Sequence, residues 1–204
     1  VWSLLIPAME QSENMGRLAF VPASVGFLLG IGFLLCIDEV VPHLHMYSDK
    51  PEGIKSGLSK HAMMLLAVTI HNIPEGMTIG ASASIANDAL NGSALVMAVL
   101  IGLHNIPEGM AISVPLISGG MSKMKAVFLT ALSGFPTVLG AFIGYAIGDV
   151  GPIGLSLSLS FASGAMLYVV YGEIIPQALL MHRSKAPAFA IIMGLIVGLL
   201  IIYI

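Results

Sequence analysis

The stretch HNIPEGM at residues 71–77 returns letter for letter at residues 104–110. Each copy lies near the middle of a long apolar run. An ionisable side chain is costly at the centre of a lipid bilayer, and there it marks a functional site by default. The repeat therefore predicts a polar site inside a hydrophobic fold.

Helical geometry predicts how the two copies meet. Residues four apart share one face of a helix, so the histidine and the glutamate of each copy point the same way. Pro74 and Pro107 lack an N–H and are expected to bend their helices. Gly76 and Gly109 allow a neighbouring helix to approach closely. Two such helices would gather one polar set: His71, Asn72, Glu75, His104, Asn105 and Glu108. Imidazole nitrogen and carboxylate oxygen suit zinc, iron, manganese and similar divalent ions.

The composition places the chain in a membrane. Hydrophobic residues make up 57% of the 204 residues and charged residues only 9%, with a mean hydropathy of +0.96. Soluble domains carry about 25% charged residues. One cysteine, Cys36, excludes an internal disulfide and a cysteine-based metal cluster. Neither a basic patch nor an aromatic platform suggests nucleic acid. We therefore predict an all-α integral membrane protein whose partner is the lipid bilayer.

The apolar runs predict a helical bundle with six full spans. A spanning helix needs about 20 mainly apolar residues. Such runs cover residues 20–42, 60–86, 92–118, 124–148, 152–180 and 187–204. Residues 1–9 are interpreted as the tail of a seventh span, so we expect the natural chain to extend upstream by at least one membrane segment. The short polar connections predict a single transmembrane domain over residues 1–204.

The basic residues predict the orientation. Seven of the eight lie in three alternate connections, residues 43–60, 119–125 and 181–186. Lys and Arg concentrate on the cytoplasmic side, so these connections are predicted to be cytoplasmic and the C-terminus outside. Adjacent spans run antiparallel, and the two HNIPEGM copies become an inverted pair at the midplane. Such a pair is typical of secondary transporters.

Further polar residues cluster toward the predicted cytoplasmic end. Asp38 closes the first full span, Glu173 lies in the fifth, and His43 and His45 follow in the inner connection. We interpret Asp38, His43 and Glu173 as exit ligands that lead from the midplane site to the cytoplasm. The alternative is that the two acids are water-exposed helix ends and the two histidines belong to a solvated loop.

The repeated motif resembles that of the ZIP family of divalent metal transporters, in particular its bacterial GufA-like branch. The similarity extends over almost all 204 residues, with supporting stretches at residues 2–8 (WSLLIPA), 37–43 (IDEVVPH) and 172–176 (GEIIP). It implies an eight-helix transporter that carries metal into the cytoplasm, with both termini outside, in the plasma membrane, here a bacterial inner membrane. The six spans would be helices three to eight, and the opening tail the end of helix two.

The resemblance also implies where the ion binds. It places His71 and Glu75 on helix four, and His104 and Glu108 on helix five. Members with a binuclear site supply an acid from helix six, where this sequence has Thr137, and an amide and an acid where it has His104 and Asn105. We therefore expect one main metal site.

Three classes of function are compared. The leading hypothesis is import of Zn²⁺, or of Fe²⁺, Mn²⁺, Co²⁺ or Cd²⁺, by alternating access to the midplane site; the ion is then the substrate, and no cofactor is expected. The alternative is a proton- or ion-coupled carrier or channel that uses Glu75 and Glu108 without metal. An enzyme is not predicted, since the H-E-x-x-H spacing of intramembrane zinc proteases is absent.

A polar network that only joins two helices is the structural alternative. The oligomeric state stays open, with a homodimer as one option.

Overall fold

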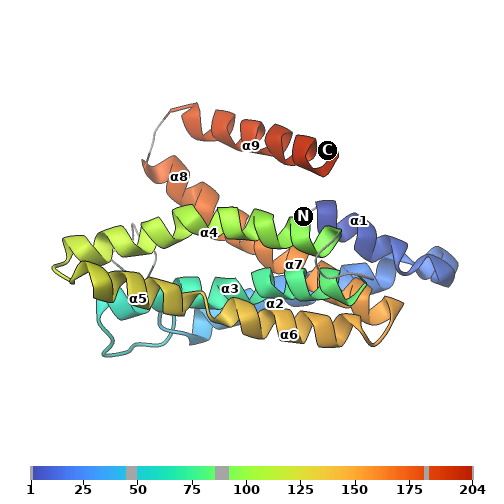
Figure 1. Ribbon diagram of the computed structural model, residues 1–204, viewed down its shortest axis with the longest axis horizontal. Helices are drawn as coiled ribbons and strands as arrows, with labels where there is room; N and C mark the ends of the chain where they lie inside the picture. Colours follow the sequence, from blue (N-terminus) through green and yellow to red (C-terminus); the bar gives the residue numbers. More distant parts are fainter. Residues whose placement is uncertain (1, 45–49, 86–91, 182–183, 204) are drawn as a thin grey trace.

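The computed structural model describes residues 2–44, 50–85, 92–181 and 184–203, and Figure 1 shows an elongated bundle of helices. Within that part, the only β-pairing is one isolated bridge between His43 and Glu52. The elements in chain order are α1 (Trp2–Glu10), the 3₁₀ turn η1 (Glu13–Leu18), α2 (Phe20–Val40), α3 (Lys60–Ser84), α4 (Ser93–Ser118), α5 (Lys123–Ser133), α6 (Pro136–Gly148), α7 (Pro152–Val169), the π-helical turn η2 (Val170–Ile174), α8 (Ile175–Met181) and α9 (Ala186–Tyr203). The prediction of an all-α membrane bundle is confirmed.

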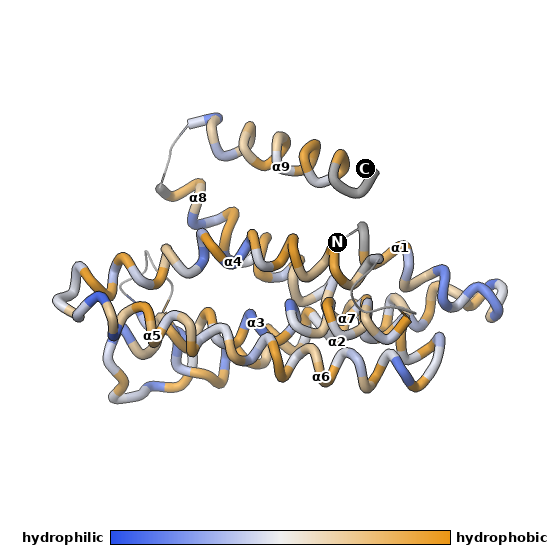
Figure 2. Tube along the Cα trace, viewed as in Figure 1, coloured by the Kyte–Doolittle hydropathy of each residue, from blue (hydrophilic) through white to orange (hydrophobic). Residues whose placement is uncertain are grey.

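Each predicted apolar run contains helix, but fewer than six qualify as spans by length and composition. Among the described residues, four stretches are long and apolar enough to cross a membrane: Phe20–Val40, Ala94–Ser118, Lys123–Gly148 and Pro152–Leu180. Helix α3 is long, but its mid-length HNIPEG segment and its other polar residues reduce its apolar character. The described apolar part of α9, Ala186–Leu200, is short. Figure 2 shows apolar residues along most of each helix, with hydrophilic ones near the turns and also within α3 and α4.

The central helices continue through their prolines. Helix α3 contains Pro74, and α4 contains Pro107 and Pro115, with no interruption of the helical assignment. A bend of the helix axes at Pro74 and Pro107 stays a prediction.

The predicted run 124–148 is not one continuous helix. Helix α5 ends at Ser133 and α6 begins at Pro136. Pro136 has no N–H to donate, and the Thr137 N–H bonds to the Gly134 carbonyl at 3.1 Å instead of reaching back four residues. The Ser133 carbonyl is thereby left without its usual helical donor. The break follows from the Gly-Phe-Pro sequence at residues 134–136.

Glycines bring two helix pairs into backbone contact. On α3 and α6, a side chain at any of four glycines would collide with a carbonyl of the facing helix: Gly76, Gly80, Gly140 and Gly144. Helices α2 and α7 have the same arrangement at Gly26, Gly30 and Gly164. Small residues allow this approach in membranes, where dispersion forces hold helices together. The α3–α6 and α2–α7 pairs meet along α3 and α7, and Asp38, His71 and Glu173 come together between these pairs.

Candidate metal-binding site

Helices α3 and α4 bring the two HNIPEGM copies together through one glutamate and one histidine. The Glu75 Oε1 atom lies 3.3 Å from His104 Nε2. Glu108, one turn after His104 on α4, completes a group whose ligand atoms all lie within 4.8 Å of one another. The Glu75 side chain is 8% exposed and that of His104 54%. The group thus has a buried end on α3 and an open end on α4.

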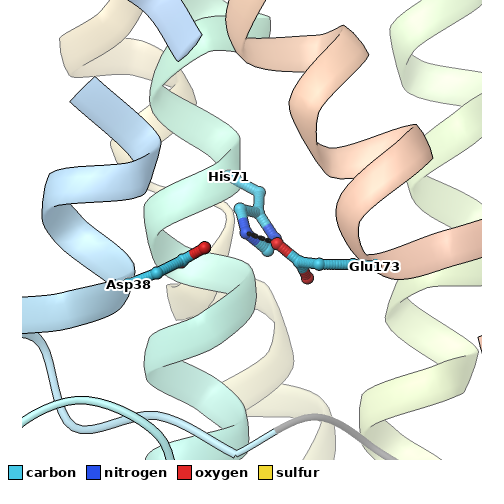
Figure 3. A group of neighbouring side chains, drawn as sticks. All are labelled: Asp38, His71 and Glu173. Atoms are coloured by element: carbon cyan, nitrogen blue, oxygen red, sulfur yellow. Dashed lines mark ion pairs between the residues drawn. The ribbon is translucent and has the colours of Figure 1, made fainter. Parts of the chain in front are cut away.

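His71 belongs to a second group, drawn in Figure 3. Its Nε2 atom lies 3.0 Å from Glu173 Oε1, and Asp38 points toward both residues. One ligand atom from each of the three lies within 4.8 Å of the others. These side chains come from α2, α3 and η2, so this group joins the two glycine-packed pairs.

The two groups face one cavity. It has a volume of about 310 Å³ and is lined by five of their six residues: His71, Glu75, His104, Glu108 and Glu173. Leu44 and Gln177 line it as well, so the cavity extends toward the end of the bundle predicted to be cytoplasmic. The sequence predicted one set of two histidines and two glutamates, whereas the structure pairs His71 with Glu173 because residues 71 and 75 lie one turn apart along α3.

Asn105 lies inside the first group. With its amide nitrogen turned toward the carboxylates, it donates to Glu75 Oε2 at 3.0 Å and to Glu108 Oε2 at 3.2 Å. It therefore connects the acids of the two copies and restricts how each can rotate. The Glu75 Oε1 atom remains directed at His104.

Asn72 makes a different contact although its sequence neighbours are identical. Its amide nitrogen donates to the Ser133 carbonyl at 2.8 Å. This is the carbonyl that lacks its helical donor at the α5–α6 break. Its Oδ1 atom is buried and has no hydrogen-bond partner among the described residues. Asn72 lines a second cavity of about 260 Å³ together with Asn105 and Glu108. The structure thus gives Asn72 a helix-joining role, and metal contact from this residue stays a prediction.

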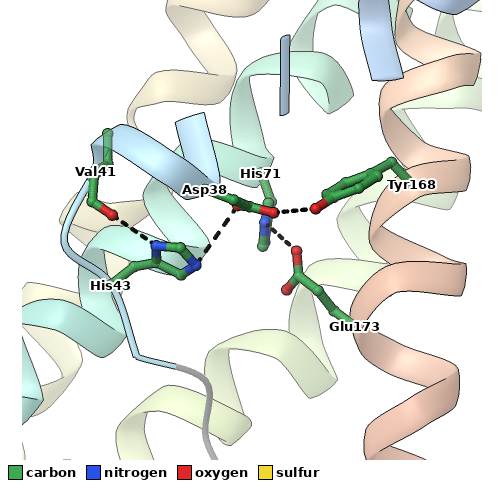
Figure 4. Close-up of polar contacts among 6 residues, drawn as sticks. All are labelled: Asp38, Val41, His43, His71, Tyr168 and Glu173. Atoms are coloured by element: carbon green, nitrogen blue, oxygen red, sulfur yellow. Dashed lines mark hydrogen bonds and ion pairs between the residues drawn. The ribbon is translucent and has the colours of Figure 1, made fainter. Parts of the chain in front are cut away.

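His43 is buried rather than part of a solvated loop. Its side chain is 1% exposed, Nδ1 donates to the Val41 carbonyl at 2.8 Å, and Nε2 lies 3.6 Å from Asp38 Oδ1. A hydrogen bond from one ring nitrogen to a backbone carbonyl fixes the tautomer and is the usual support of a metal-binding imidazole. Figure 4 shows His43 beside Asp38, at the edge of the second group. His45 lies outside the described residues.

Sequence reasoning missed Tyr168. The hydroxyl of this α7 residue donates to Asp38 Oδ2 at 2.5 Å, as Figure 4 shows. Tyr168 precedes Glu173 by five residues, a spacing that an α-helix does not place on one face. The π-helical turn at Val170–Ile174 changes that register, and the sequence carries no clear signal for it.

The chemistry of both groups suits a divalent cation. Each offers one imidazole and two carboxylates, so a doubly charged ion would balance the two negative charges. Bonds of about 2.0–2.1 Å in a tetrahedral zinc site place neighbouring ligand atoms about 3.3–3.4 Å apart. The 3.3 Å between Glu75 and His104 matches this separation, and the 3.0 Å between His71 and Glu173 is slightly shorter. Nitrogen and oxygen donors without sulfur suit zinc, manganese and iron.

Comparison with known proteins gives a consistent result. Residues 45–204 match the family model described as ZIP zinc transporter. The zinc transporter ZIP11 of Xenopus tropicalis is 34% identical over 96% of this chain and 81% of its own length. The zinc transporter GufA of Myxococcus xanthus is 34% identical over 90% of this chain and 71% of its own. The zinc transporter ZupT of Salmonella newport (strain SL254) is 28% identical over 96% and 76%.

The contact of Asn72 with Ser133 generates a test of its helix-joining role. Asn72→Ala leaves the Ser133 carbonyl without a donor in the membrane interior, so we expect unfolding to become easier by about 1–2 kcal/mol. The measurement is the unfolding midpoint of the purified protein in mixed detergent micelles. Ser113→Ala serves as the control, because that hydroxyl makes only an exposed 3.5 Å contact within α4. Equal midpoints for the two variants would show that the contact does not join the helices.

Proposed function

This chain belongs to the ZIP family of zinc transporters, and on that basis we propose that it carries Zn²⁺ or a similar divalent transition-metal ion into the cytoplasm. The observation that carries the proposal is the pair of groups, each with one imidazole and two carboxylates, on one intramembrane cavity. Fe²⁺, Mn²⁺, Co²⁺ and Cd²⁺ are the other ions that such donors accept. The metal is the substrate, and the proposal requires neither a cofactor nor enzymatic activity.

Glu75, His104 and Glu108 form the first binding position in this proposal. An arriving ion would enter between Glu75 Oε1 and His104 Nε2, whose separation already suits two ligands of one ion. Asn105 supports this position because it holds the second oxygen of each glutamate. His104 is the exposed member, so it is the ligand that an ion would meet while still partly hydrated.

His71, Glu173 and Asp38 form the second position. His71 lies one helical turn from Glu75, on the side of α3 nearer the predicted cytoplasmic end. The two residues are about 6 Å apart along the helix axis at 1.5 Å per residue. Because both groups face one cavity, an ion could pass between them while keeping at least one protein ligand. His43, beside Asp38, would be the next ligand before the cytoplasmic connection.

Alternating access would use the two glycine-packed pairs as rigid bodies. In the α3–α6 pair, α3 carries both His71 and Glu75. In the α2–α7 pair, α2 carries Asp38, and η2, which follows α7, carries Glu173. Contact within each pair is backbone to backbone, so sliding between the pairs is easier than separation within them. Such a movement would change the distance between His71 and Glu173, and with it the exposure of the ion.

The location and orientation are part of the proposal. The apolar helices and the family place the protein in a membrane, and we propose the plasma membrane, the inner membrane of a bacterium. The basic residues support a cytoplasmic position for connections 43–60, 119–125 and 181–186 and an external C-terminus. Residues 45–49 and 182–183 of these connections lie outside the described part. One transporter domain over residues 1–204 stays a prediction, as does a homodimer.

Loss of a first-position ligand should abolish most transport. We expect His104→Ala and Glu75→Gln each to reduce Zn²⁺ uptake by at least about tenfold to hundredfold, since even supporting residues of metal sites have effects of that size. The measurement is uptake of radioactive zinc by liposomes that contain the purified protein. Glu39→Gln is the matched control, because Glu39 is an exposed acid at the end of α2. Wild-type uptake by folded His104 and Glu75 variants would contradict the assignment. A proton or ion flux that needs no metal would favour the alternative carrier.

The donor set also predicts the order of competing ions. Mixed nitrogen and oxygen ligands favour transition metals over Mg²⁺ and Ca²⁺, which require six or more oxygen ligands. We expect unlabelled Cd²⁺, Mn²⁺ or Fe²⁺ to reduce labelled zinc uptake at comparable concentrations, and Mg²⁺ or Ca²⁺ to have no effect at about hundredfold excess. Inhibition by Ca²⁺ as strong as that by Cd²⁺ would instead indicate an all-oxygen site.

A further inference from the structure

Tyr168 makes a short hydrogen bond to a residue of the second position. Its hydroxyl lies 2.5 Å from Asp38 Oδ2, within the 2.5–2.7 Å typical of O–H donors to ionised carboxylates. Such charge-assisted bonds are about twice as strong as neutral ones. The other oxygen of Asp38, Oδ1, faces His43 Nε2. Figure 4 shows the carboxylate between these two side chains, with His71 and Glu173 beyond it.

The π-helical turn places Tyr168 and Glu173 on the same side of their helix. In a regular α-helix, residues five apart are offset by about 140°, because 3.6 residues make one turn. In η2 the Ile175 N–H bonds to the Val170 carbonyl five residues back, which accommodates one extra residue and reduces the offset to about 40°. Both side chains then reach the face that meets α2 and α3. Single π turns of this kind are frequent at functional sites.

Neighbouring residues hold the Tyr168 ring in place. A Cβ on Gly172 would lie 3.6 Å from two ring carbons, which is ordinary van der Waals contact. The ring therefore packs over a position that carries no side chain. Close backbone packing of α2 against α7 at Gly26, Gly30 and Gly164 fixes the distance between Asp38 and Tyr168. The hydrogen bond is thus part of a rigid pair rather than of a mobile loop.

We propose that Tyr168 is a positioning residue that makes Asp38 a weak, one-oxygen ligand from which the ion leaves toward the cytoplasm. This inference rests on the proposed function. With Oδ2 accepting from the phenol, Oδ1 is the Asp38 oxygen open to an ion, and coordination by both oxygens would compete with that hydrogen bond. Conduction requires sites that bind an ion strongly enough to accept it and weakly enough to release it. The last acidic ligand before water is where weak binding has most effect on turnover.

Tyr168→Phe tests this role, because it keeps the ring over Gly172 and removes only the hydroxyl. We expect the maximum rate of zinc uptake in liposomes to fall by about three- to tenfold, the KM to fall as well, and zinc binding in detergent to tighten. All three changes follow from an Asp38 with two available oxygens, which holds the ion longer. An unchanged rate and KM, or a higher KM at an unchanged rate, overturns the proposal.

Two further variants separate positioning from a general structural effect. In an Asp38→Asn background, Tyr168→Phe should change neither rate nor KM, since its effect passes through the Asp38 carboxylate; an equal loss in both backgrounds overturns the proposal. Tyr171→Phe is the matched control, because Tyr171 is a tyrosine of η2 that is 66% exposed, and it should behave as wild type. If the wild-type protein binds zinc but transports none, the proposed function fails. Zinc binding by Tyr168→Phe still tests the inference in that case. Tighter binding than in the wild type supports it, and unchanged or weaker binding overturns it.

Discussion

Carboxylates inside a membrane bundle are the constraint on which this structure depends. A charge buried in hydrocarbon is stable only when it is paired or hydrogen-bonded. Three acids of the site have a partner on another helix, whereas Glu108 accepts from Asn105 of its own helix. Glu75 faces His104, and Glu173 faces His71. Asp38 accepts from Tyr168 and lies beside His43. A divalent ion would provide the same compensation more strongly, so the arrangement is suited to exchange one partner for another as an ion passes.

The two identical HNIPEGM segments have unlike roles because the surrounding helices differ. A Cβ on Gly76 would collide with the backbone of α6, whereas a Cβ on Gly109 would meet only the Thr130 methyl group, at 3.4 Å. The α3 copy is therefore the buried one, and its Asn72 supplies the donor that the α5–α6 break requires. The α4 copy is more exposed, and its Asn105 is available to connect the two glutamates. Packing therefore gives the same sequence a buried, helix-joining position on α3 and a more exposed position on α4.

Much of the fold follows from the sequence, since apolar runs of spanning length can form only helices in lipid. The spacing of His and Glu within each copy also predicts that polar groups converge between α3 and α4. The partner of His71 was not predictable, because Glu173 lies in a π turn about 100 residues later in the chain. The same π turn explains why Tyr168 was not predicted as part of the site, because residues five apart do not share a face of an α-helix. The α5–α6 break was readable from Gly134 and Pro136, but apolar composition favoured one continuous run.

The most direct test of the central claim is to locate a bound ion. Crystals of the protein grown with Zn²⁺ or Cd²⁺ would be measured at the absorption edge of the metal, and the anomalous signal would give its position. We predict a peak in the cavity between α3 and α4, with nitrogen from His104 and oxygens from Glu75 and Glu108 about 2.0–2.3 Å from the ion. A peak confined to surface histidines, with Glu75 and His104 still in direct contact in metal-saturated protein, would contradict the account.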